Sequence, residues 1–186
     1  MIRGEETIDF TMKRQMIEAP TIEHEMLENQ VGYIMITEFD GVTDEQFQTA
    51  LTELQNQGMK KLVIDLRNNG GGSVESVCNI ADELLPEGAI VYTEYKGKER
   101  EARNSEADCI NIPMSVIING ASASASEILS GALQDYGVAT IVGTQSYGKG
   151  IVQSILDLQD GTALKLTTAK YYTPNGNDIH GVGITP

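Results

Sequence analysis

Apolar runs typical of strands alternate with helical patterns along most of this chain. The strand-like runs lie at 31–36, 61–66, 89–95, 114–118 and 139–142. Apolar residues at helical spacing predict helices at 43–57, from 74 to shortly before Pro86, and at about 125–136. Strands alternating with short helices are typical of an α/β layer fold with a mostly parallel sheet.

The remaining segments give weaker signals. Residues 1–30 are polar and predict one exposed strand and a connector through Pro20. The charged segment 96–103 is interpreted as a solvated loop. Alternating residues at 151–158 and 162–172, joined at Asp160-Gly161, predict a hairpin. A length of 186 residues fits one domain.

Composition excludes several classes of function. The net charge is −14, which argues against a nucleic-acid partner because phosphate binding requires a basic surface. The two cysteines have neither disulfide-framework nor metal-site spacing, and the two histidines lie far apart. No apolar run approaches the length of a membrane span, and we expect no signal peptide.

A serine-rich turn precedes the last predicted helix. Ser124 and Glu127 have the spacing of a capping box, which places Ala125 at the first helical position. The N–H of Ala125 is then free beside the serine oxygen, as an oxyanion donor must be. The alternative is that Ser124 only caps the helix.

The segment 143–150 resembles a phosphate-binding loop but lacks its decisive features. Gly150 stands where a Ser or Thr hydroxyl would hold magnesium, and a strand pattern follows in place of a helix. We therefore reject a nucleotide cofactor. Lys149, flanked by glycines, is a candidate general base, and the alternative is a lysine whose amine lies in water.

A glycine-rich loop, Asp65-Leu-Arg-Asn-Asn-Gly-Gly-Gly72, follows the second strand of the main pattern. Such a loop lets the main chain approach a ligand closely and present N–H groups. The alternative is a tight strand-to-helix connection. Together, the three segments supply a nucleophile, a base and oxyanion donors at strand ends, where α/β folds place their sites.

Read in order, these segments resemble the C-terminal processing peptidases, the tail-specific protease family of serine peptidases. The resemblance begins near Arg14 and is carried by motifs spread over the chain: Val31-Gly-Tyr-Ile34, 65–72, Ser122-Ala-Ser-Ala-Ser-Glu127, Gly148-Lys-Gly150 with Val152-Gln153, Leu164–Pro174, Gly176 and Ile179–Ile184.

The resemblance implies a role for each matched residue. Ser124 would be the nucleophile, Lys149 the base and Gln153 the residue assisting it, while Gly71 and Ala125 would donate to the oxyanion. Asp135 also matches a recurring family position, and we interpret it as structural support. No metal or other cofactor is implied.

The resemblance also implies a fold and a setting. We expect a ClpP/crotonase-like β/α superhelical core, with residues 1–186 forming a single catalytic domain. Members usually carry a preceding PDZ domain, and residues 1–18 would be a remnant strand adjoining it. The loop has Gly70 where many members have proline.

Substrates would be peptides or unfolded proteins with apolar C-termini. We expect the protein to act outside the cytoplasm, and the oligomeric state stays open.

Two other classes compete with a peptidase. A crotonase-like acyl-CoA enzyme would share the architecture but would not need Lys149 and Gln153 at this spacing. A non-catalytic peptide-binding relative would be expected to lack Ser124 or Lys149, and both are present. As a base, Lys149 must be neutral, which predicts apolar surroundings without a close acid.

Overall fold

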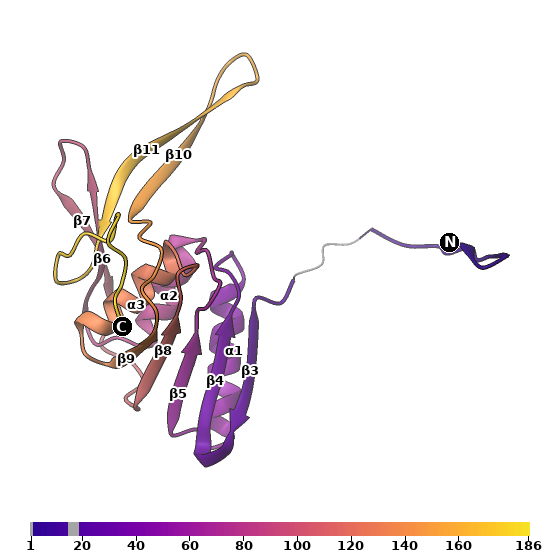
Figure 1. Cartoon of the computed structure of the whole chain (residues 1–186), viewed down its shortest axis with the longest axis horizontal. Coiled ribbons are helices and arrows are strands. Elements are labelled where there is room, and N and C mark those ends of the chain that lie inside the picture. The colour runs from indigo at the N-terminus through magenta and orange to yellow at the C-terminus, as the bar shows by residue number, and fades with distance from the viewer. Residues whose placement is uncertain (1, 15–18) are drawn as a thin grey trace.

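The computed structural model describes residues 2–14 and 19–186, and its centre is a five-stranded sheet (Figure 1). The strand order is β3 (Ile22–Leu27), β4 (Val31–Ile36), β5 (Lys61–Asp65), β8 (Met114–Ile118) and β9 (Ala139–Gly143). Strands β4, β5, β8 and β9 are parallel, and β3 joins as an antiparallel edge. The predicted α/β class and the mostly parallel character of this sheet are confirmed.

One face of the sheet is buried more deeply than the other. Along β4 buried and half-buried residues alternate, so that Ile34 and Ile36 are fully buried while Tyr33 is not. In β5 the same holds for Leu62 and Ile64 against the half-buried Val63. Strand β5 is therefore buried more deeply on one face than on the other.

A second sheet is wholly antiparallel. It contains β10 (Ile151–Asp157), β11 (Ala163–Tyr172), β6 (Gly88–Tyr95) and β7 (Arg100–Ser105) in that order. The interpretation of 96–103 as a loop is wrong from Arg100 onward, because β7 pairs with β6 through its main chain. Its side chains are exposed except Ser105, as is typical of a charged edge strand.

Three helices of the described chain pack against the sheets: α1 (Thr43–Asn56), α2 (Val74–Asp82) and α3 (Ala125–Asp135). Helix α1 contacts β3 and β4, α2 contacts β6 and β7, and α3 contacts both β9 and β6. Their apolar faces supply much of the core, including Phe47, Leu51, Leu54, Val77, Ile80, Ile128, Leu129 and Leu133.

The helix starts test two sequence signals. Ser73 caps α2 as predicted, because its hydroxyl accepts a hydrogen bond from the Ser76 N–H at 3.2 Å. The spacing of Thr43 and Gln46 also matches a capping box, but Thr43 lies inside α1 and its hydroxyl accepts from the Asp40 N–H. Gln46 instead accepts from the Thr21 N–H, so this pair attaches the N-terminal connector to α1.

The N-terminal residues differ from expectation. Residues 2–14 contain the short antiparallel pair β1 (Ile2–Arg3) and β2 (Glu6–Thr7), which lies apart from both sheets in Figure 1. The predicted exposed strand is therefore replaced by this pair and by β3, and a 3-10 turn, η1 (Glu28–Gln30), connects β3 to β4. The expected remnant strand at 1–18 lies partly outside the described residues. None of the described helices is long and apolar enough to cross a membrane.

Candidate active site

The three segments singled out from the sequence meet at one edge of the parallel sheet. Strand β5 leads into the glycine-rich loop 66–72, β8 into the turn 119–124, and β9 into the loop that ends at Lys149. Because parallel strands place their carboxyl ends at a common edge, residues far apart in the chain converge there.

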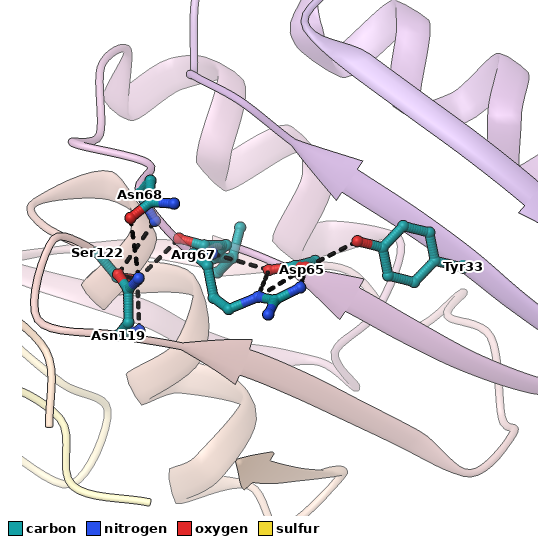
Figure 2. A network of polar contacts seen from close by, with 7 residues as sticks. Tyr33, Asp65, Arg67, Asn68, Asn119 and Ser122 are labelled. Atoms are coloured by element: carbon teal, nitrogen blue, oxygen red, sulfur yellow. Dashed lines mark hydrogen bonds and ion pairs between the residues drawn. The ribbon is translucent and has the colours of Figure 1, made fainter. Parts of the chain in front are cut away.

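Side-chain amides join the β5 loop to the β8 turn (Figure 2). The Asn119 side chain accepts from the Asn68 N–H at 3.1 Å and donates to the Asn68 side-chain oxygen at 2.9 Å. The buried Ser122 hydroxyl donates to the Leu66 carbonyl at 2.7 Å. These contacts set the position of the turn two residues before Ser124.

An ion pair fixes the end of β5 itself. Asp65 is 1% exposed and accepts hydrogen bonds from the Arg67 guanidinium and from the Tyr33 hydroxyl, the latter at 2.7 Å. Burial alone would raise the pKa of Asp65, but the hydrogen bonds from Arg67 and Tyr33 outweigh it and hold the pKa below its usual value. Burial is the largest cause of the raised pKa of Tyr33, and the hydrogen bond to Asp65 raises it further.

Asn69 is the buried centre of the glycine-rich loop. Its side chain donates to the Ile36 carbonyl at 2.8 Å, and its main-chain oxygen accepts from the Ala123 N–H and from the Ser126 hydroxyl, both at 3.0 Å. The loop is thereby attached to β4 on one side and to the start of α3 on the other.

Ser124 occupies the N-cap of α3 in a rare main-chain conformation. Its φ is 57° and its ψ is −112°, a region that is costly for a residue with a Cβ and is concentrated at functional sites. The Glu127 carboxylate accepts from the Ser124 N–H at 2.8 Å, as the predicted capping box requires. The surrounding contacts therefore maintain Ser124 in a strained conformation at the start of α3.

The predicted oxyanion donors lie side by side. A Cβ added to Gly71 would be 2.9 Å from the Ala125 nitrogen, so the two main-chain segments are in contact. Within the described residues the Ala125 N–H has no acceptor, whereas the Gly71 N–H donates to the Asn69 side chain at 2.8 Å. The N–H of Gly72, which sequence reasoning did not select, also lacks an acceptor there, and Gly72 lines the cavity described next.

Ser124, Lys149 and Gln153 line a single cavity of about 340 Å³. Its walls combine polar and apolar groups: Gly72 and Lys165 lie beside side chains from α2, β10 and β11, namely Val74, Ile151, Val152, Ile155 and Tyr171. Burial raises the pKa of Tyr171 to about 12, so this phenol stays uncharged. The fold thus brings together the three side chains for which the sequence predicted a part in the chemistry.

The catalytic hydrogen bonds themselves are not made in this structure. Neither the Ser124 hydroxyl nor the Gln153 side chain is hydrogen bonded to the Lys149 amine. Among the described residues, the recorded ion pairs do not include Lys149, and no cluster of potential metal ligands is found. Hydrogen bonds of a catalytic set are often long until substrate binds.

Glu127 joins Ser124 to the loop that carries Lys149, a connection that its position in the sequence did not reveal. Its side chain is fully buried and accepts from the N–H groups of Gly148 and Lys149 at 2.6 and 2.8 Å and from the Ser146 hydroxyl at 2.6 Å. With the Ser124 N–H, four donors compensate this carboxylate for its burial. The capping-box spacing identified Glu127, but not its long-range partners.

Asp135, interpreted as structural support, is half-buried at the end of α3. Its carboxylate accepts from the Asn175 N–H at 2.8 Å. It thus attaches the C-terminal segment to the helix that begins at Ser124.

Comparison with known proteins gives consistent matches. The profile of peptidase family S41 matches residues 30–186. The chain is 37% identical over 188 residues to a "Probable CtpA-like serine protease" of Staphylococcus aureus, covering 99% of this chain and 38% of that protein. It is 40% identical over 187 residues to a carboxy-terminal-processing protease of Bartonella bacilliformis, covering 96% and 43%.

Solved structures agree with the sequence matches. The photosystem II D1 C-terminal processing protease superposes with a TM-score of 0.83 and 33% sequence identity, over 92% of this chain and 48% of that one. A lipoprotein from Streptococcus agalactiae shares the fold with a TM-score of 0.72 at 20% identity, over 90% and 64% of the two chains. The chain spans less than half the length of the two curated relatives.

Proposed function

This chain belongs to peptidase family S41, and on that premise we propose that it hydrolyses peptide bonds with Ser124 as nucleophile and Lys149 as general base. The observation that supports this most strongly is that the two side chains line one cavity, although 24 residues separate them in the sequence. The fold assignment that goes with the proposal is a ClpP/crotonase-like β/α superhelical core.

In the proposed first step, neutral Lys149 takes the hydroxyl proton as Ser124 attacks the substrate carbonyl. The attack forms a tetrahedral intermediate, which collapses as protonated Lys149 gives its proton to the departing amine, so that the C-terminal product leaves and an acyl-enzyme remains. Water then hydrolyses the ester and regenerates the serine. Gln153 orients the amine without adding a charge.

The oxyanion would be stabilised at the start of α3. The free N–H of Ala125 and the positive end of the helix dipole both favour negative charge beside Ser124. Gly71 is the proposed second donor and would exchange its bond to Asn69 for one to the substrate oxygen. Gly72, whose N–H has no acceptor within the described chain, is the competing second donor.

The apolar walls support substrates with apolar residues beside the cleaved bond. We propose peptides or unfolded proteins with apolar C-termini, processed near that end, and a location outside the cytoplasm. Processing near the C-terminus extends to this chain what the names of its relatives describe, while the location and the apolar C-termini follow from the family resemblance. A peptide with a free apolar C-terminus should be cleaved faster than the same peptide ending in aspartate.

Hydrolysis of denatured casein tests the peptidase assignment. We expect the 186-residue chain to release peptides and Ser124→Ala to release none above background. Ser154→Ala, which removes a hydroxyl paired with Thr168 on the hairpin, is the matched control and should remain active. Casein binding without cleavage by the wild-type chain would instead indicate a non-catalytic peptide-binding relative.

A further inference from the structure

The loop that carries Lys149 is hydrogen bonded to the last residues of this sequence. Residues 179–184, here called the C-terminal strap, run along this loop and contribute two buried side chains, Ile179 and Ile184, to the core. The Gly181 N–H donates to the Gly148 carbonyl at 3.0 Å, and the Ser146 N–H donates to the Ile184 carbonyl at 3.0 Å.

The packing between strap and loop leaves little space. A Cβ on Gly183 would lie 2.8 Å from the Ser146 carbonyl oxygen, and a Cβ on Gly150 would lie 2.5 Å from the His180 nitrogen. The loop on either side of Lys149 is therefore in direct main-chain contact with the strap, and neither can shift without the other.

Ser146 connects this strap to the buried Glu127. Its hydroxyl accepts from the Ile184 N–H at 2.7 Å and donates to Glu127 Oε1 at 2.6 Å, and Ser146 is 7% exposed. Since the strap N–H occupies an acceptor position of the hydroxyl, the single hydroxyl proton is directed to Glu127.

The Glu127 carboxylate connects Ser146 to the segments that carry Ser124 and Lys149. One oxygen, Oε2, accepts from the N–H of Ser124 and from that of Lys149, each at 2.8 Å. The other, Oε1, accepts from Ser146 and Gly148. A rotation of the carboxylate would therefore displace the nucleophile and the base relative to each other.

We infer that Ser146 is a positioning residue: through Glu127 it couples the seating of the C-terminal strap to the alignment of Lys149 with Ser124. The inference rests on the proposed function, because it concerns the geometry of that Ser-Lys pair. Ser146 does not line the cavity, so its loss should slow the chemical step and leave substrate binding nearly unchanged.

Steady-state kinetics on a fluorogenic peptide, with hydrogen exchange of the free protein, test this role. For Ser146→Ala we expect kcat to fall about tenfold or more, because small misplacements of catalytic groups are costly, while KM stays within about twofold. Exchange at the Gly148 and Lys149 amides should become faster. Ser146→Thr keeps the hydroxyl and should recover most of kcat, whereas Ser146→Val, of nearly the same shape, should not.

Ser130→Ala is the matched control. Ser130 is also fully buried and donates one hydrogen bond, to the Ser126 carbonyl at 2.7 Å, but it makes no hydrogen bond to the described residues of the loop or the strap. We expect this variant to lose stability without a comparable loss of kcat or faster exchange at Lys149.

The outcomes separate this inference from the proposed function. Wild-type kcat in Ser146→Ala, equal kcat in the Thr and Val variants, or an equal loss in Ser130→Ala would overturn the positioning role. If the wild-type chain cleaves no peptide, the proposed function fails, and the exchange at Gly148 and Lys149 still decides whether Ser146 holds the loop.

Discussion

Gly71 lies against Ser124 so closely that a Cβ at position 71 would be 2.7 Å from the Ser124 Cβ and 2.6 Å from the Ala123 carbonyl oxygen. Its φ is +100°, which side chains other than that of glycine rarely adopt. The glycine-rich loop is therefore needed for the approach of two main-chain segments, and this relationship gives the first prediction.

Gly71→Ala should inactivate the protein and destabilise it by about 1–3 kcal/mol, because the added methyl group clashes and the conformation is strained. Gly70→Ala is the control, since a Cβ there would meet nothing within 4 Å. Peptide hydrolysis and urea unfolding of both variants provide the measurement. Equal activity of the two variants would show that the close approach is not required.

The pH dependence of stability should contain a contribution from Asp65. Its folded-state pKa is lowered, so its ionised form stabilises the fold above the unfolded-state pKa of about 3.9, and this stabilisation is lost as the pH falls through the folded-state value. The free energy of unfolding of the wild type should therefore fall more between about pH 6 and pH 3 than that of Asp65→Asn.

Asp9→Asn, which changes an exposed carboxylate in the N-terminal segment, is the reference for this measurement. It should keep the wild-type pH dependence. If Asp65→Asn also keeps it, the ion pair with Arg67 contributes nothing to acid sensitivity.

The two faces of the β10–β11 hairpin should differ in function. Ile155 is 66% exposed and lines the cavity, while the adjacent Leu156 is 48% exposed and is not part of the cavity, because successive side chains of a strand point to opposite faces. Ile155→Ser should raise KM for an apolar peptide several-fold, whereas Leu156→Ser should leave it near the wild-type value. A KM that responds equally to both changes would place substrate elsewhere.

The cysteines should react at different rates. Cys78 is buried and burial raises the pKa of its thiol to about 11, so little thiolate forms. Cys109 is partly exposed. Iodoacetamide at pH 8 should modify Cys109 in the native protein and Cys78 only after unfolding, as read by peptide mass spectrometry. Rapid modification of native Cys78 would contradict its burial in the core.

The sequence predicted the elements that carry strong apolar patterns. Strands β4, β5 and β8 and helices α1 and α3 were located to within one or two residues, since burial imposes periodicity on them. Strand β7 was missed because its charged side chains face water and only main-chain hydrogen bonds make it a strand. Residues 22–27, β3, were missed for a similar reason, as most of their side chains are exposed.

The chemistry-bearing residues were easier to find than the contacts that position them. Ser124, Lys149 and Gln153 stand in recognisable local motifs, and the structure brings them to one cavity. The four donors to Glu127 come from two separate segments, so local spacing revealed only the Ser124 N–H. The hydrogen bond from the Gly71 N–H to the Asn69 side chain likewise depends on the conformation of the folded loop.

The most direct test of the account is the turnover of a fluorogenic peptide by Lys149→Arg. Arginine is similar to lysine in length, but it is permanently charged and cannot act as a base at neutral pH. Relative to wild type, we predict a kcat lower by about a hundredfold or more, as expected when a general base is lost, together with a thermal midpoint close to that of the wild type. Wild-type turnover by Lys149→Arg would contradict the role of Lys149 as the group that deprotonates Ser124.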